Sequence, residues 1–218
     1  MSMTGLLSSR DRILSSAKEL FAKNGYENTS TVAIARQAGT SESQLMKHFG
    51  SKQGLLFAIV DQGWTAILQR AYALSSVPVR SQRSLIDALE SYVVELAHDS
   101  AMKTLVVLES RRARRESSGP HPPEGSQQFG TLIESLLRDL KNQGTVRAEL
   151  NVTAVRAALF GMMEGLLLEE ILAASNNRQA LYGSDEVRRV LETFVFGLTE
   201  PLTSEQDEQP STSWTHAD

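Results

Sequence analysis

The sequence predicts an all-α protein, in which an N-terminal domain of three short helices is joined by a long helix to a larger C-terminal bundle, with about nine helices in all. Apolar residues recur every three to four positions along nearly the whole chain, and no segment alternates polar and apolar residues as a strand would. The 218 residues are enough for a small module and a larger one. We expect the first domain over residues 8–68, the second over 80–200, and a disordered acidic tail over 201–218.

The composition is that of a globular protein and excludes several classes of protein and of functional site. Apolar residues make up 41% and charged residues 22%, and the absence of cysteine excludes disulfides and thiolate sites. No apolar run approaches the ~18 residues of a membrane span, and residues 1–10 lack a signal pattern, so we expect a cytoplasmic protein with no membrane partner. Residues 1–55 carry seven Lys or Arg against four Asp or Glu, whereas the rest carries 15 against 22. A basic first domain on an acidic body indicates that the first domain meets an anion.

The first three helices have recognisable ends. The first helix has one apolar face and stops at Gly25, and the second stops at Gly39. The third starts at Ser41, which fits a capping box with Gln44. Three short helices with a tight turn between the last two describe a helix-turn-helix, whose motif we place at about residues 31–50.

The third helix has a polar outer surface. Leu45 and Phe49 share one face and can pack on the first two helices, which leaves Ser43, Gln44 and Lys47 pointing elsewhere. Such a helix can enter a DNA major groove, about 12 Å wide. There Gln44 can pair with adenine, Ser43 with several bases, and Lys47 with guanine or phosphate; the alternative for Gln44 is a purely capping role.

The remaining helices follow from the same periodicity. Ser51 caps a long fourth helix, and a segment rich in proline and glycine at 117–126 interrupts the pattern in the body. Apolar stripes predict further helices around residues 85–96, 102–108, 129–140, 153–172 and 185–198.

A dense series of residues between positions 10 and 57 carries a family resemblance. The matching positions are Ile13-Leu14, Ala17, Leu20-Phe21, Gly25-Tyr26, Thr29, Ile34-Ala35, Ala38-Gly39, Ser41, Leu45, His48-Phe49, Ser51-Lys52 and Leu55-Leu56. With them the segment resembles the DNA-binding domain of the TetR family of bacterial repressors. The resemblance implies an all-helical homodimer that binds a palindromic operator and is released by a small molecule bound in the C-terminal body.

The resemblance also implies roles for single residues. Ser30 and Thr31 match positions at the start of the second helix that contact the DNA backbone, where free amides favour phosphate. Residues 42–48 match the recognition helix, and Lys52 matches a phosphate-binding lysine.

Two positions depart from the family pattern. Met46 stands where a phosphate-binding tyrosine is usual, and Glu42 stands where a basic or neutral residue is common. The Glu42 carboxylate can accept from a cytosine amine or merely favour the amino end of the helix, and His48 can contact phosphate or be a surface residue. The predicted DNA-binding residues are Ser30, Thr31, Glu42, Ser43, Gln44, Met46, Lys47, His48 and Lys52.

The last two predicted helices are apolar on more than one side. A helix that buries two faces needs two neighbours, and a partner subunit can supply one; the alternative is the core of a monomeric bundle. We predict a four-helix dimer interface that includes Gly161, Gly165, Leu168, Val187, Leu191, Phe194 and Val195.

An effector site is predicted inside the body. Methionine and aromatic side chains suit an adaptable apolar cavity, although plain core packing explains them equally well. The arginine run at 111–115 can meet an anionic group of an effector or simply end a helix favourably. The candidate effector-binding residues are Tyr92, Met102, Val106, Phe129, Ile133, Phe160, Met163 and Leu167.

The sequence thus predicts a DNA-binding transcriptional regulator, in the first instance a homodimeric repressor, with double-stranded DNA and a small effector as partners. We predict no catalytic residue, metal or cofactor, because the four histidines lack metal-ligand spacing and no phosphate loop or nucleophile elbow is present. The alternative, suggested by Met46 and Glu42, is a helical protein that binds or processes a small molecule and whose head has lost DNA binding. An enzyme as such is the third interpretation.

Overall fold

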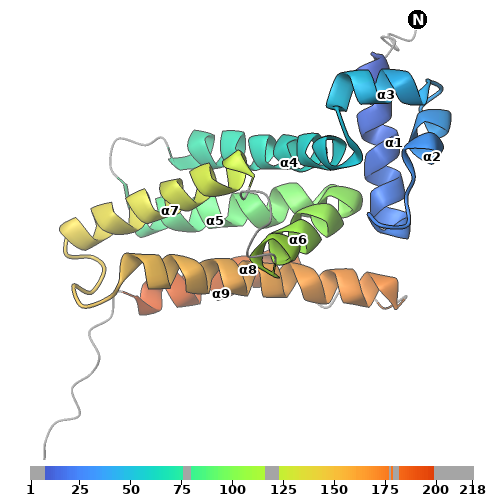
Figure 1. Ribbon diagram of the computed structural model, residues 1–218. Coiled ribbons are helices and arrows are strands. Elements are labelled where there is room, and N and C mark those ends of the chain that lie inside the picture. The colour runs from blue at the N-terminus through green and yellow to red at the C-terminus, as the bar shows by residue number, and fades with distance from the viewer. Residues whose placement is uncertain (1–7, 76–79, 116–122, 177, 179–181, 199–218) are drawn as a thin grey trace, which may run out of the picture.

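The computed structural model describes residues 8–75, 80–115, 123–176, 178 and 182–198, and these residues are helical without a strand (Figure 1). The prediction of an all-α fold is therefore confirmed. The proposed tail at 201–218 and most of the proline-rich break lie outside the described residues. The helices are α1 (Ser9–Asn24), α2 (Thr31–Gln37), α3 (Glu42–Phe49), α4 (Lys52–Ser75), α5 (Gln82–Ala97), α6 (Ser100–Arg115), α7 (Glu124–Asn142), α8 (Val152–Ser175) and α9 (Ser184–Gly197).

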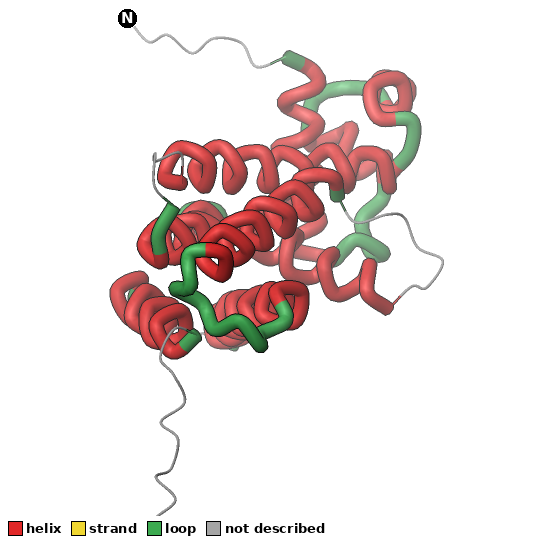
Figure 2. Tube along the Cα trace, turned by 90° about the vertical axis from the view of Figure 1, so that its left-hand side faces the viewer, coloured by secondary structure: helices red, strands yellow, loops and turns green. Residues whose placement is uncertain are grey.

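The helices form a small head on an elongated body. In Figure 1, α1, α2 and α3 gather at one end, and α4 leaves this head and runs along the body beside α5 and α7. The helices α8 and α9 lie on the side of the body away from α4, and α6 crosses between them and the head, as the turned view also indicates (Figure 2). Among the described residues, no helix is both long and apolar enough to cross a membrane.

Local chemistry accounts for the helix ends in the head. The hydroxyls of Ser30, Ser41 and Ser51 accept hydrogen bonds from backbone amides three residues later, at 3.2, 3.2 and 2.9 Å, and so cap α2, α3 and α4. The turn between α2 and α3 contains Gly39 with φ 62°, a left-handed conformation that costs glycine little. The capping box expected at Ser41 is only half present, because the Gln44 side chain accepts from the Thr40 hydroxyl instead.

A compact core fixes α3 on the head. Leu45 is fully buried and belongs to the same hydrophobic core as Ile13 and Phe21 of α1, Ile34 of α2 and Leu55 of α4, each at most 2% exposed. Because α3 is only two turns long, this one inserted leucine largely determines which side of the helix points outward.

The centre of the body is a ladder of aromatic rings. Trp64 of α4 packs on Tyr92 of α5 with ring centroids 5.4 Å apart, Tyr92 on Phe129 of α7 at 5.9 Å, and Phe129 on Phe160 of α8 at 5.6 Å. A Cβ added at Gly125 would lie 2.4 Å from the Trp64 Cβ, so α7 approaches α4 closely only because this residue is glycine. The helix α4, which leads out of the head, is thus packed tightly into the core of the body through Trp64.

Candidate DNA-binding interface

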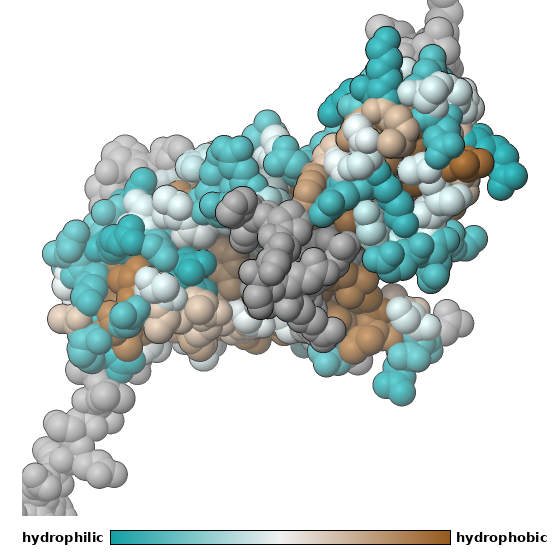
Figure 3. Space-filling model, in the orientation of Figure 1, coloured by the Kyte–Doolittle hydropathy of each residue, from teal (hydrophilic) through white to brown (hydrophobic). Residues whose placement is uncertain are grey.

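The outer face of α3 is polar and exposed. Ser43, Gln44 and Lys47 are exposed on the side away from buried Leu45, as the sequence predicted. Figure 3 shows that hydrophilic side chains dominate the visible surface of the head. The Gln44 side-chain oxygen accepts from Thr40, which holds the amide and leaves its NH₂ group to donate outward. Thr40 was not among the predicted residues, because a contact of this kind depends on side-chain orientation.

A cleft of about 530 Å³ opens beside α3, where it meets the start of α2. Lys52 borders it, and its Nζ lies 4.3 Å from the Tyr26 ring centroid and donates to the Glu27 carbonyl at 3.3 Å. An ammonium group beside hydroxyls and a helix amino end can bind a phosphate oxygen. The structure therefore brings five predicted residues together around the cleft: Ser30, Thr31, Glu42, Met46 and Lys52.

Glu42 changes the electrostatics of this cleft. Its carboxylate accepts a hydrogen bond from the Thr31 hydroxyl, so the acid is held at the start of α3 and one of the expected phosphate donors is already engaged. A fixed negative charge beside Lys52 weakens phosphate binding at this point. Met46 is 42% exposed and offers the cleft an apolar side chain without a hydrogen-bonding group.

His48 lies on the opposite flank of α3. Its Nε2 is 3.3 Å from the Ser9 hydroxyl at the start of α1, and the Arg10 guanidinium lies 5.4 Å from the Phe49 ring centroid. Arg10 is an exposed cation beside the end of α3 that the sequence analysis did not single out. In the sequence only the positive charge of Arg10 pointed to a contact with DNA, because Arg10 and Phe49 are 39 positions apart in the chain.

The candidate effector residues are interior. All eight are at most 9% exposed, and three of them, Tyr92, Phe129 and Phe160, belong to the aromatic ladder. Met102 and Val106 of α6 face Gly63 of α4. This is the packing of a core, the second interpretation that the sequence offered, and their contact with an effector stays a prediction. The side chains of the arginine run at 111–115 lie outside the described part of the chain.

The predicted dimer residues divide between two environments. A Cβ at Gly161 or Gly165 would have no atom within 4 Å, Phe194 is 38% exposed and Leu168 is half-buried, so these four lie on open faces of α8 and α9. The assignment of the other three is wrong. Val187, Leu191 and Val195 are at most 3% exposed, because this face of α9 packs inside the protomer against α5.

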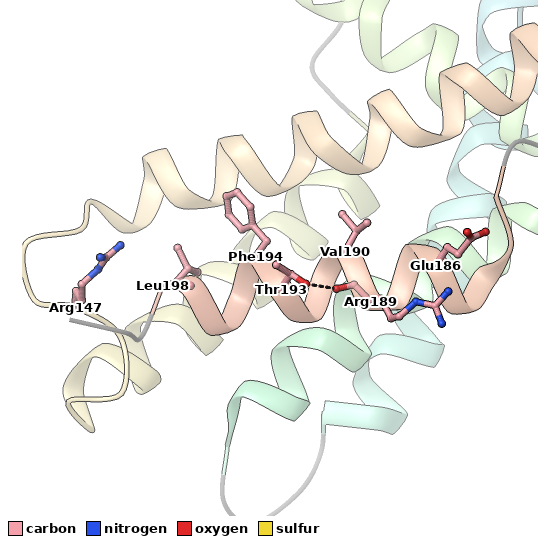
Figure 4. Close-up of a pocket in the computed structure, with 8 residues that line it drawn as sticks. Arg147, Glu186, Arg189, Val190, Thr193, Phe194 and Leu198 are labelled. Carbon is pink, nitrogen blue, oxygen red and sulfur yellow. Dashed lines mark hydrogen bonds between the residues drawn. The ribbon is translucent and has the colours of Figure 1, made fainter. Parts of the chain in front are cut away.

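The open face of α9 lies on its other side. Val190 is 43% exposed, and Figure 4 shows it projecting from the same side of α9 as Phe194. Together with Arg147 and Arg189 these residues line a groove of about 740 Å³. On α8, small and apolar residues continue the face of the two glycines: Ala154, Ala157, Ala158, Leu168 and Leu172.

These features define a class of protein. A capped, exposed and polar two-turn helix, held by a three-helix core at the end of a helical body, is the arrangement of a helix-turn-helix DNA-binding protein. Comparison with known proteins makes the class more specific. Residues 13–59 match the family described as bacterial regulatory proteins, tetR family.

Relatives and solved structures agree with that match. The chain is 25% identical to the transcriptional regulator UidR of Escherichia coli K12 over 162 residues. This alignment covers 73% of this chain and 80% of UidR. It is 42% identical over 52 residues to QacR of Staphylococcus aureus, covering 24% of this chain and 28% of QacR. The fold is similar to that of the regulator FadR from Bacillus subtilis, solved with stearoyl-CoA, with a TM-score of 0.70, 16% identity, and coverage of 87% of this chain and 98% of FadR.

Residues 13–59 thus carry the DNA-binding domain of the TetR family, and the chain is similar over most of its length to a transcriptional regulator. Both relatives are named as transcriptional regulators, which agrees with the interpretation of this chain as a regulator.

Proposed function

We propose that this protein is a homodimeric repressor that binds a palindromic operator through α3 and is released from it by a small, largely apolar effector. The observation that carries the proposal is the exposed polar face of α3, with Ser43, Gln44 and Lys47 outward and Leu45 fully buried. Side chains in this arrangement can reach base edges in the major groove, while Lys52 and the start of α2 can hold the backbone.

The second subunit would cover the open faces of α8 and α9. Gly161 and Gly165 leave α8 flat enough for a second backbone to approach closely, and Phe194 with Val190 offers apolar surface beside it. A two-fold arrangement of this kind would place two copies of α3 on one side of the DNA, where successive major grooves are about 34–36 Å apart.

DNA binding is tested with the promoter region of the gene itself and a random fragment of equal length, in rising salt. We expect the promoter preference to persist while the affinity falls steeply, because counterions return to the phosphates. A reporter gene behind the same promoter then distinguishes repression, which we expect, from activation. Equal affinity for both fragments would contradict the proposal.

The alternative of a binding protein that has lost DNA recognition is motivated by the Glu42 charge in the cleft and by Met46. It is decided by one variant. If the wild type binds neither fragment and Met46→Tyr creates strong promoter binding, the alternative is correct.

The proposed effector is apolar because the side chains at the centre of the body, among them Phe129, Met163 and Leu167, are apolar and buried. Because the similar FadR structure holds stearoyl-CoA, the first probes are long-chain acyl-CoA esters added to the protein–promoter complex. We expect an acyl-CoA to dissociate the complex at a concentration that leaves a random-DNA complex unchanged. No effect of any chain length would exclude this effector class.

A further inference from the structure

The first turn of α6 lies between the head and the body and is bonded to both. On the head side, the Lys18 Nζ of α1 is 2.5 Å from the Asp99 Oδ2, which immediately precedes α6. The other oxygen, Asp99 Oδ1, accepts from the Met102 amide at 2.9 Å and so caps α6. One carboxylate therefore both starts α6 and ties α6 to α1.

The state of Asp99 agrees with this double role. Partial burial opposes its charge, but the hydrogen bond and positive charge of Lys18, together with the amides of Met102 and Ala101, outweigh burial and lower the pKa of Asp99. The carboxylate is therefore ionised at neutral pH.

On the body side, α6 is anchored one turn further on. The Lys103 Nζ lies 2.6 Å from the Glu170 Oε2 on α8, and these side chains are only 13% and 17% exposed, compared with 27% and 37% for Lys18 and Asp99. The more buried pair is screened less by solvent. The first turn of α6 is thus joined to α1 by one ion pair and to α8 by a second, more buried one.

The helix that carries the head also touches this turn. A Cβ at Gly63 of α4 would lie 2.7 Å from the Met102 Sδ, so α4 and α6 are in close contact here. A shift of α4 along the body has to displace the same first turn of α6. Three elements thus converge on it: α1 through Lys18, α4 through Gly63, and α8 through Glu170.

We propose that Lys18 and Asp99 are positioning residues that set the orientation of the DNA-binding head relative to α8, through the first turn of α6. The inference rests on the proposed function in one respect: orientation matters for DNA affinity because the two copies of α3 must enter successive major grooves. If the head turns more freely, a smaller fraction of the protein has the head orientation that binds DNA. The apparent affinity for DNA falls in proportion to that fraction.

The test separates the ion pair from the cap. Asp99→Asn removes the charge but keeps an oxygen that caps α6, and Lys18→Gln removes the charge from the other side. Lys18→Arg keeps the charge and serves as the conservative variant. Glu95→Gln is the matched control, because the Arg70–Glu95 pair, with side chains 45% and 27% exposed, joins α4 to α5 without touching α1.

Head orientation is measured without DNA. Because the chain has no cysteine, spin labels at Arg36→Cys in the head and Gln143→Cys beyond α7, both exposed sites, report one head-to-body distance, with labelled protein diluted into unlabelled protein. We expect Asp99→Asn and Lys18→Gln to broaden this distribution, the double variant to broaden it no further, and Lys18→Arg and Glu95→Gln to leave it unchanged.

DNA affinity supplies the second readout, in protein without labels. Promoter affinity should fall up to about fivefold in Asp99→Asn and Lys18→Gln, the range expected for a partly exposed ion pair. An unchanged distance distribution in both variants overturns the proposal, as does a broadened one with unchanged promoter affinity. If the wild type fails to bind DNA, the proposed function fails, while the distance distribution still decides whether this pair orients the head.

Discussion

Removal of the Lys52 ammonium group should weaken DNA binding in a way that depends on salt and not on sequence. The structure holds the Lys52 Nζ against the Tyr26 ring and the Glu27 carbonyl, at the edge of the cleft beside α2. On the proposed function, Lys52 contacts one phosphate per head and no base. We therefore expect Lys52→Ala to lower affinity for the promoter and for random DNA alike.

The magnitude follows from counterion release. Each phosphate contact contributes about 0.9 to the slope of log affinity against log salt, so a dimer without both contacts should lose about 1.8 of that slope. Over a fourfold rise from about 50 to 200 mM salt, the ratio of wild-type to variant affinity should shrink by roughly 12-fold. The assay is a series of fluorescence-anisotropy titrations of a labelled promoter fragment at five salt concentrations.

Lys141→Ala is the matched control. Lys141 also donates to a loop carbonyl, that of Leu150 at 2.9 Å, but it lies at the end of α7, far from the head in Figure 1. Its removal should leave the slope unchanged. A parallel loss of affinity at every salt concentration in Lys52→Ala would refute the phosphate assignment and would indicate that Lys52 merely supports the fold of the head.

Three further predictions concern other parts of the molecule. Gln44→Ala should relax the preference at one base pair by about 1–3 kcal/mol, measured by competition among single-base operator variants, whereas a uniform loss would make Gln44 only a cap. Gly165→Leu should abolish the dimer in sedimentation experiments while Ala174→Leu, at an exposed site elsewhere on α8, should not; a dimer in both would contradict the proposed interface. Burial, followed by the charges of Glu170 and Glu169, raises the pKa of Tyr182 to about 12. The stabilisation by the neutral phenol, which donates to the Leu166 carbonyl, is therefore complete below pH 10 and is lost as the pH rises through 12. Denaturation curves at several alkaline pH values should show a smaller loss of stability in Tyr182→Phe than in the wild type, and equal losses would disprove the shift.

Much of the head could be predicted because its signals are local. Serine caps at residues 30, 41 and 51 act on amides three residues away, and Gly25 and Gly39 end or follow helices within the same stretch of chain. The burial of Leu45 and Ile34 follows from the helical period alone. These features depend on neighbours in sequence, so the position of α3 and its polar face could be inferred without coordinates.

Contacts between side chains that are distant in sequence could not be inferred. The engagement of Glu42 by Thr31, and of Gln44 by Thr40, depends on rotamers and on the angle between two helices. The pair formed by Lys18 and Asp99 joins residues 81 positions apart, and no periodicity relates them.

By itself the sequence determined where the helices lie and which short segment can face DNA, since capping and periodicity are properties of consecutive residues. Only the tertiary structure decided which face of α9 is covered. That helix has apolar residues on two sides, so its hydrophobicity was equally compatible with either side facing inward. Packing against α5 buries Val187, Leu191 and Val195 and leaves Phe194 exposed. The sequence could not predict this, because an apolar stripe indicates that a helix packs against a neighbour but not which neighbour covers which side.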